Sequence, residues 1–322
     1  MDSGLEMDRI RAATTEAHRR FQEVEEGKNA DYIPVLARVP SKLFAVVVMT
    51  PEGETAEAGD ARHPFAIESI SKVFTLAKVL DEVGPEELRR RIGSNPTGES
   101  FSSVQALLLH GGRPLNPFVN AGAIATVSLV QAGSAEERWK KVLATMAAFA
   151  GRDLALMDEV YRSEAATNQH NRAIAWLMDS MHTLYSDPME ATDVYTRQCS
   201  VGITCHDLAV MGATLAARGV NPLTGAPAVR EENVSRILAE MAVNGLYDNT
   251  GGWQYEVGLP GKSGVGGGLL AVVPGRLSIA AFSPPLDTFG NSVRGQHAIR
   301  FLSGELGLNL FAPPDGRGRD AA

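Results

Sequence analysis

The chain has little cysteine and no concentrated positive charge, and both shortages exclude classes of protein. Cys199 and Cys205 are the only cysteines in 322 residues, so no disulfide framework is expected. We predict two buried structural thiols, because no second Cys/His group lies nearby to complete a zinc site. The net charge is -8, and basic residues come only in short runs such as Arg89–Arg91. Nucleic acid and anionic membranes are therefore poor partners.

Long apolar segments are missing as well. No stretch approaches the about 18 consecutive apolar residues that span a bilayer. Residues 1–27 have early acids and lack the apolar core of about 7 or more residues that a secretory signal needs. We therefore expect a protein of the cytosol.

What the chain does contain is strands near both ends and helices between them. We predict a helix over 4–26, strands over 42–50 and 53–58, almost only helices over 103–242, strands on both sides of Pro274–Arg276 and a closing helix over 290–306. This order predicts an α/β (α+β) fold in which a mostly antiparallel sheet is flanked by terminal helices and carries an inserted helical lobe. We expect one domain over 1–311, with its cleft between a sheet lobe (27–66 and 245–311) and a helical lobe (67–244). The tail 312–322 is predicted to be disordered.

The segment FAIESISKVF, residues 65–74, places a lysine in the pattern of a buried helix. Lys72 follows Ser69 by three residues, so on an α-helix the two side chains lie on the same side. Burial lowers the pKa of a lysine, which can then act as a base near neutral pH. A serine needs such a base to become a nucleophile. S-x-x-K is so short that it also occurs on ordinary surface helices, so a second signal is needed.

The second signal is GKSGVGGGLL, residues 261–270. Lys262, Ser263 and Gly264 open a predicted strand and resemble the K-T-G element that accompanies S-x-x-K in serine β-lactamases and penicillin-binding proteins. The backbone N–H of Val265, together with that of Ser69, can form an oxyanion hole. A phosphate-binding loop is disfavoured because Glu256 stands where its first glycine is required. A glycine-rich structural hairpin is the simpler alternative.

Dispersed blocks of sequence extend this resemblance over about residues 27–308. The chain resembles the serine-dependent glutaminase family, which has the β-lactamase-like fold, in DYIPVLA, FAIESISKVF, NPFVNAGAIA, SEAATNQHNRAIA, YTRQCSV, NGLYDNTGG, KSGVGGG and GNSVRG. Eight blocks in the same order are far more specific than one motif.

The resemblance implies an enzyme that hydrolyses L-glutamine without metal or cofactor. It implies Ser69 as nucleophile, Lys72 as base, Tyr195 or Tyr247 as the proton donor, and Lys262 and Ser263 as supporting residues. The glutamine-binding set would be Ser69, Asn120, Glu164, Asn171, Tyr195, Tyr247 and Val265, with Tyr32 as a further contact. An α-ammonium group suits a carboxylate, and an α-carboxylate suits amide and hydroxyl donors. A homotetramer is also expected from the resemblance.

Several of these residues have simpler explanations. Asn120 could cap a helix, Glu164 could be an acid in the first turn of the next helix, and the two tyrosines could be core aromatics. For Asn168, a solvated polar role is the favoured interpretation. The chain also departs from the family pattern at Glu68, where Gln is expected, at Ser102 and at Asn244. A carboxylate at position 68 bears on the pH optimum and rate more than on the reaction type.

Two other functions remain open at this point. A penicillin-interacting hydrolase or peptidase of the same fold would be exported, which the absent signal sequence disfavours. A non-catalytic amino-acid sensor would not need Ser69, Lys72 and Lys262.

Overall fold

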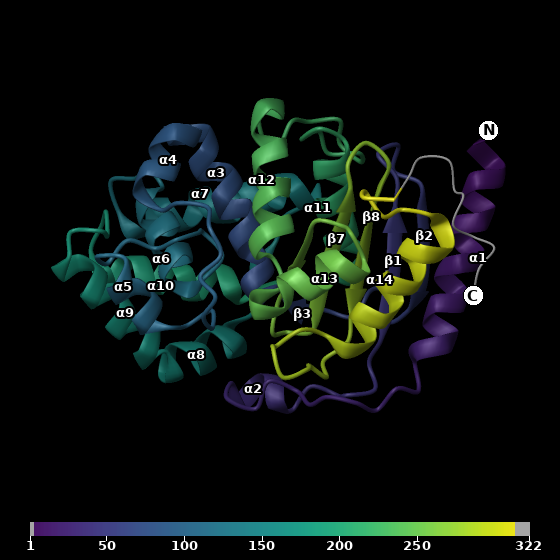
Figure 1. The fold of residues 1–322 in the computed structure, drawn as a ribbon, viewed down its shortest axis with the longest axis horizontal. Coiled ribbons are helices and arrows are strands. Elements are labelled where there is room, and N and C mark those ends of the chain that lie inside the picture. Colours follow the sequence, from purple (N-terminus) through teal and green to yellow (C-terminus); the bar gives the residue numbers. More distant parts are fainter. Residues whose placement is uncertain (1–2, 313–322) are drawn as a thin grey trace.

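A five-stranded antiparallel sheet joins the two ends of the chain. The computed structural model describes residues 3–312, and Figure 1 shows the sheet between two groups of helices. Its strand order is β2 (Thr55–Gly59), β1 (Ala45–Met49), β8 (Leu277–Phe282), β7 (Gly268–Val273) and β6 (Gly261–Ser263). β1 pairs with β8 in the register Ala45↔Phe282, so segments more than 200 residues apart form the centre of the sheet. The predicted antiparallel sheet is confirmed.

Both faces of the sheet are covered, and β1 shows how. Val46 and Val48 pack with the terminal helices α1 (Ser3–Phe21) and α14 (Val293–Leu306). Val47 and Met49 point to the opposite face, which α11 (Cys205–Ala216) covers. All five residues of β1 are buried, as expected for a strand enclosed on two sides.

Most of the remaining elements are helices. These are α2 (Pro34–Ala37), α3 (Ser71–Val83), α4 (Pro85–Arg91), α5 (Val104–Leu109), α6 (Asn120–Leu129), α7 (Ala135–Ala150), α8 (Asp158–Thr167), α9 (Gln169–Ser180), α10 (Pro188–Cys199), α12 (Glu231–Asn244) and α13 (Thr250–Glu256). A second, small sheet has the order β3 (Phe65–Ala66), β5 (Val201–Ile203) and β4 (Ala155–Leu156). Two of its strands interrupt the stretch predicted as almost only helical, and they are too short for strand alternation to be recognised.

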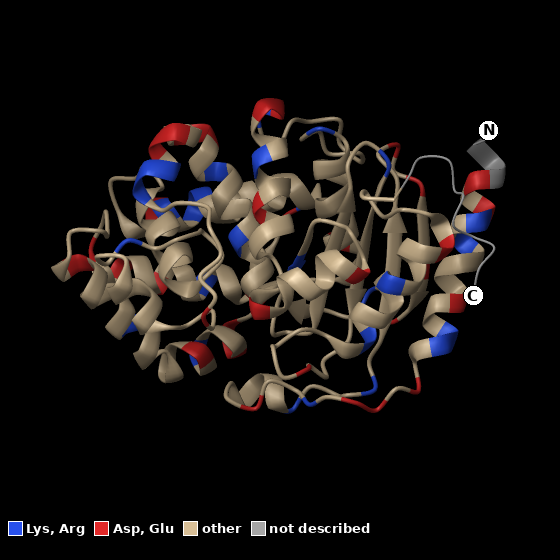
Figure 2. Cartoon of the chain, viewed as in Figure 1, with Lys and Arg blue, Asp and Glu red and all other residues tan. Residues whose placement is uncertain are grey.

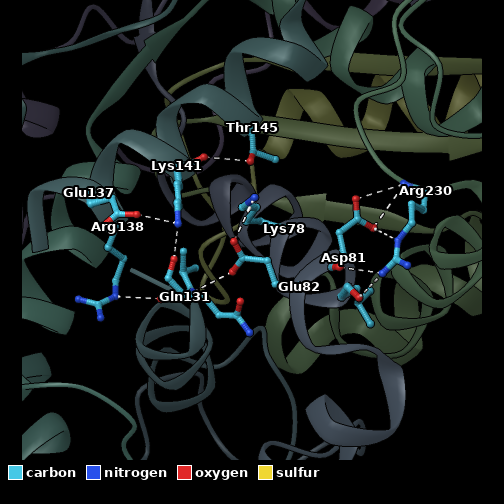
Figure 3. A network of polar contacts seen from close by, with 11 residues as sticks. Lys78, Asp81, Glu82, Gln131, Glu137, Arg138, Lys141, Thr145 and Arg230 are labelled. Atoms are coloured by element: carbon cyan, nitrogen blue, oxygen red, sulfur yellow. Dashed lines mark hydrogen bonds and ion pairs between the residues drawn. The ribbon is translucent and has the colours of Figure 1, made fainter. Parts of the chain in front are cut away.

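The C-terminal end of α3 is tied to its neighbours by polar contacts (Figure 3). Glu82 pairs with Lys78 at 3.1 Å and accepts a hydrogen bond of 2.8 Å from the backbone N–H of Gln131. Asp81 accepts from Asn233 at 2.7 Å and lies 3.4 Å from the Arg230 guanidinium at the start of α12. These contacts hold the helix that carries Lys72.

Three expectations need correction or limits. The first helix ends at Phe21 rather than at 26, and the residues before Ser71 form a 3-10 turn, Glu68–Ile70, rather than the start of an α-helix. The predicted disordered tail lies outside the described residues except for Ala312.

Charges of both signs alternate over the outer helices instead of gathering on one face (Figure 2). Over residues 3–312, no helix is both long and apolar enough to cross a membrane.

Candidate active site

Ser69 lies in a strained turn between β3 and α3. Glu68 has φ +52°, a left-handed conformation that is uncommon for a residue other than glycine. Strain of this kind persists where the surrounding structure holds it and is concentrated at functional sites. The turn leaves Ser69 buried, with its backbone N–H at the start of the helix, where N–H groups lack intrahelical acceptors.

Lys72 is held in the interior by two acceptors. Its side chain is 1% exposed, and Nζ donates to the Phe118 carbonyl at 3.0 Å and to Asn120 Oδ1 at 2.8 Å. Burial lowers the pKa of Lys72 to about 8. A neutral amine has two hydrogens and one lone pair, so these two acceptors satisfy its hydrogens and leave the lone pair for a proton. In the described part of the chain, the amine forms no hydrogen bond with the Ser69 hydroxyl.

Asn120 connects the lysine to two further residues. Its Oδ1 also accepts from the Tyr195 hydroxyl at 3.0 Å, and its Nδ2 donates to Asn171 Oδ1 at 3.1 Å. Helix α6 begins at Asn120 and its cap position is Val119, so the Asn120 side chain does not cap the helix. This chain of hydrogen bonds fixes side chains from α3, α6, α9 and α10 relative to one another.

The glycine-rich strand β6 and the turn after it lie against the Glu68–Ile70 turn that carries Ser69. Lys262 is fully buried and donates to the carbonyls of Gly245 at 3.0 Å and Ser263 at 2.7 Å. Burial, with a smaller contribution from nearby Lys72, lowers the pKa of Lys262 well below its usual value. Its Nζ lies 4.5 Å from the ring centre of Tyr247.

Tyr247 lies near both Ser69 and Lys262. Burial raises the pKa of Tyr247, and hydrogen bonding with the Ser69 side chain opposes that rise. Its hydroxyl also lies 3.3 Å from the Ser263 carbonyl oxygen. Burial raises the pKa of Tyr195 as well, so both phenols keep their protons at neutral pH.

A cavity of about 410 Å³ opens beside Ser69. The predicted residues that line it are Tyr32, Ser69, Asn120, Glu164, Asn171, Tyr195 and Val265. Glu164 belongs to the second half of α8, so it is not a first-turn acid, and burial raises its pKa to about 7. Asn168 also lines this cavity and donates to Thr196 Oγ1 at 3.0 Å, so it is not simply solvated.

Some of the predicted site residues lie outside this cavity. Some residues that line it were not predicted from the sequence. Lys72, Lys262 and Ser263 are buried behind the wall, while Tyr247 lines a neighbouring cavity of about 270 Å³. Phe101 lines both cavities, and its ring lies 4.7 Å from that of Tyr247. Glu68, Cys199 and His170 also line the larger cavity. Of these, Glu68 had a signal, its departure from the family pattern.

One cluster in the described residues has the geometry of a metal site. Carboxylate oxygens of Glu68 and Glu164 and the Cys199 sulfur lie within 4.8 Å of one another. Burial raises the pKa of the Cys199 thiol and of both carboxyl groups, which favours protons over a metal ion. Cys199 and Cys205 are buried free thiols, as predicted.

Comparison with known proteins gives one consistent family. The family model described as Glutaminase matches residues 27–311. The glutaminase of Bordetella avium strain 197N is 58% identical over 307 residues, covering 95% of this chain and 98% of that protein. The glutaminase of Mycobacterium marinum is 55% identical over 306 residues, covering 95% and 96% of the two chains.

Solved structures agree with this result. The probable glutaminase ybaS superimposes with a TM-score of 0.94 at 55% identity and covers 95% of this chain and 99% of its own. Mglu in its glutamate form gives 0.90 at 38% identity, with 94% and 70% covered. The probable glutaminase of Bacillus subtilis gives 0.88 at 28% identity, with 94% and 98% covered. The predicted β-lactamase-like α/β fold is therefore confirmed, and the chain belongs to the glutaminase family.

Proposed function

We propose that the chain hydrolyses the side-chain amide of L-glutamine to L-glutamate and ammonia through an ester on Ser69. The observation that carries this proposal is the environment of Lys72. Its amine is shielded from solvent and already donates two hydrogen bonds. Lys72 follows Ser69, which lines the cavity, by one helical turn. A lysine in this state is a base ready to accept one proton.

The reaction begins when Ser69 Oγ attacks the amide carbon and its proton moves to Lys72 Nζ. The backbone N–H groups of Ser69 and Val265 hold the oxyanion, and the Val265 N–H has no backbone acceptor in the described chain. Tyr247 protonates the departing nitrogen, because its pKa responds to the Ser69 hydroxyl and its 3.3 Å hydrogen bond to the Ser263 carbonyl is longer than the 3.0 Å bond from Tyr195 to Asn120. The proton held by Lys72 then returns to Tyr247. Ammonia leaves, and water hydrolyses the γ-glutamyl ester to glutamate and free Ser69.

The amino-acid end of the substrate fits the far part of the cavity. Glu164 supplies a carboxylate for the α-ammonium group, and Asn171, with the tyrosine hydroxyls, supplies polar partners for the α-carboxylate. Mglu, solved in its glutamate form, is a relative that bears on this assignment. The proposed steps use only groups of the chain and water.

The test is ammonia release from glutamine, asparagine and a β-lactam by the natural protein, Ser69→Ala and Ser71→Ala. Ser71 is the matched control, because its buried hydroxyl donates to the Glu68 carbonyl at 2.7 Å and so is already engaged. We expect glutamine to be the substrate, Ser69→Ala to abolish turnover and Ser71→Ala to retain at least about a tenth of it. Turnover by Ser69→Ala would refute the mechanism. Acylation by a labelled penicillin would favour the penicillin-interacting hydrolase, and glutamine binding without turnover would favour the sensor.

Three further features belong to the proposal. The chain acts in the cytosol, assembles as a homotetramer, and forms one catalytic domain over 1–311 with the sheet and helical lobes predicted from the sequence. The family match over residues 27–311 and the strand pairing between both chain ends support a single domain.

A further inference from the structure

The glycine-rich turn packs closely against Glu68, the residue before the proposed nucleophile. A Cβ added at Gly266 would lie 2.4 Å from the Ala66 carbonyl oxygen and 3.2 Å from Glu68 Cγ. A Cβ added at Gly264 would lie 2.8 Å from the Ile67 carbonyl oxygen and 3.4 Å from Glu68 Cβ. Together with the left-handed backbone at Glu68, this packing fixes where its carboxyl group points. The side chain of Glu68 is therefore positioned by the fold rather than left free.

The carboxyl group of Glu68 is buried without a partner for one oxygen. The residue is 3% exposed, lines the cavity, and its Oε1 accepts no hydrogen bond within residues 3–312. Glu164 is a close neighbour of this carboxyl group. The Oε1 of Glu164 accepts a hydrogen bond of 3.4 Å from the Ser200 hydroxyl. Oxygens of the two carboxyl groups lie within 4.8 Å. Glu68 is buried and Glu164 half-buried, and two carboxylates this close at a largely desolvated cavity wall do not both ionise, so the pair retains a proton.

We propose that Glu68 is a substrate-positioning residue, which shares one proton with Glu164 in the free enzyme and releases that proton when the α-ammonium group of the substrate binds. This inference rests on the proposed function, which places that ammonium group at Glu164. An incoming cation balances a second negative charge, so the pair can lose its proton only when the substrate is present.

The surroundings of Glu68 support this assignment. Its pKa is raised by burial first and then by Glu164, while Lys72 on α3 opposes the rise. Cys199 and Tyr195 face it from α10, and both keep their protons because burial raises their pKa values. Tyr32 and Tyr247 are also near Glu68, because its negative charge contributes to the raised pKa of each phenol. Lys262 on β6 directs its amine to the carbonyls of Gly245 and Ser263 instead. Glu164 is thus the partner with which the proton is shared.

The experiment is calorimetric titration of L-glutamine into Ser69→Ala, which prevents turnover, in buffers of different ionisation enthalpy at about pH 6.5. At this pH Lys72 stays protonated, because its pKa is about 8. We expect release of up to about one proton per bound glutamine, and an affinity that rises up to about tenfold per pH unit. Adding Glu68→Gln, which keeps the shape and removes one ionisable carboxyl group, should clearly lower the release, leaving only the part that Glu164, with its pKa of about 7, contributes alone. Adding Glu240→Gln should leave it unchanged, because Glu240 is a partly buried carboxyl group on α12, with pKa raised to about 7, bound to Asn244 rather than to Glu164.

Each outcome decides a different point. Equal proton release with and without Glu68→Gln overturns the inference but leaves the proposed function standing. No binding of glutamine by folded Ser69→Ala overturns the proposed function itself. If Glu68→Gln does not fold, the infrared difference spectrum of Ser69→Ala on glutamine binding gives the answer. Loss of the carbonyl stretch of a protonated carboxyl supports the shared proton, and no such loss overturns it.

Discussion

Helix α3 carries two lysines, Lys72 and Lys78, in opposite environments. Lys72, in the first turn, is 1% exposed and its amine binds only neutral oxygens. Lys78, nearly two turns later, pairs with Glu82 in a partly solvated network (Figure 3). A buried amine without a counter-ion costs folding free energy, whereas a partly solvated ion pair has a much smaller net effect on it. The environment of Lys72 at the first end therefore fits the proposed role of a base, whereas the charges at the second end connect the helix to its neighbours.

The strongest way to test this contrast is to make the same substitution at both ends. Lys72→Met should lower kcat/KM by about 10²- to 10⁴-fold, the usual contribution of a general base. It should not lower the free energy of unfolding, because an apolar side chain replaces a desolvated amine. Lys78→Met should leave kcat/KM within about twofold and cost about 1 kcal/mol or less. Steady-state kinetics and urea unfolding of both variants measure these effects, and a stability loss confined to Lys72→Met would reverse the comparison.

The pH dependence of the natural enzyme sharpens the role of Lys72. The base acts when neutral, so kcat/KM should rise at least about tenfold per unit up to the pKa of about 8 and then level off. Stability gives a second measure. The folded pKa lies below the ordinary value of 10.5, so the unfolded chain binds more protons between about pH 8 and 10.5. The contribution of Lys72 to stability must therefore rise with pH across that window. The difference in unfolding free energy between natural protein and Lys72→Met reports it, and a difference independent of pH would contradict the lowered pKa.

A substitution in the glycine-rich turn beside the Ser69 end of α3 should have a smaller effect on kcat/KM than Lys72→Met. Gly266→Ala places a Cβ 2.4 Å from the Ala66 carbonyl oxygen, so the strand or the Ser69 turn must move. We expect kcat/KM to fall at least about tenfold, since small misplacements of reacting groups are costly, and the protein to lose about 1–3 kcal/mol. Gly304→Ala on α14 is the control, because nothing lies within 4 Å of its added Cβ. It should leave activity unchanged and add up to about 1 kcal/mol. Equal activity losses in the two variants would show that the turn has no special role.

Parts of the site were visible in the sequence because they depend on side chains at fixed spacing. Ser69 and Lys72, with the glycine-rich strand after Lys262, were of this kind. Other parts depend on backbone geometry. One of the two acceptors for Lys72 is the carbonyl of Phe118, a group that every residue carries. The 3-10 turn at Ser69 spans only three residues, Glu68–Ile70, too few for an apolar pattern to distinguish it from an α-helix.

The fold also has parts that the sequence predicted and parts that it did not. The antiparallel sheet followed from strands at both chain ends, whereas β3, β4 and β5 are only two or three residues long. The position of Glu68 needed both its left-handed backbone and the absence of side chains at Gly264 and Gly266. The two features come from separate stretches, residues 65–74 and 261–270, which only the fold brings together.

The smallest predicted effect lies at the distal end of α3. Arg230→Ala removes a guanidinium that lies 3.4 Å from Asp81, but Asn233 still donates to that carboxylate at 2.7 Å. Since the Arg230 side chain is 53% exposed, we expect a loss of about 0–1 kcal/mol and kcat/KM within about twofold of the natural value. Asp81→Asn should lose somewhat more, because it weakens the contacts from both Arg230 and Asn233. If either variant lowered kcat/KM tenfold at unchanged stability, the distal network would be coupled to Lys72 along the helix, and the two ends would not be separable.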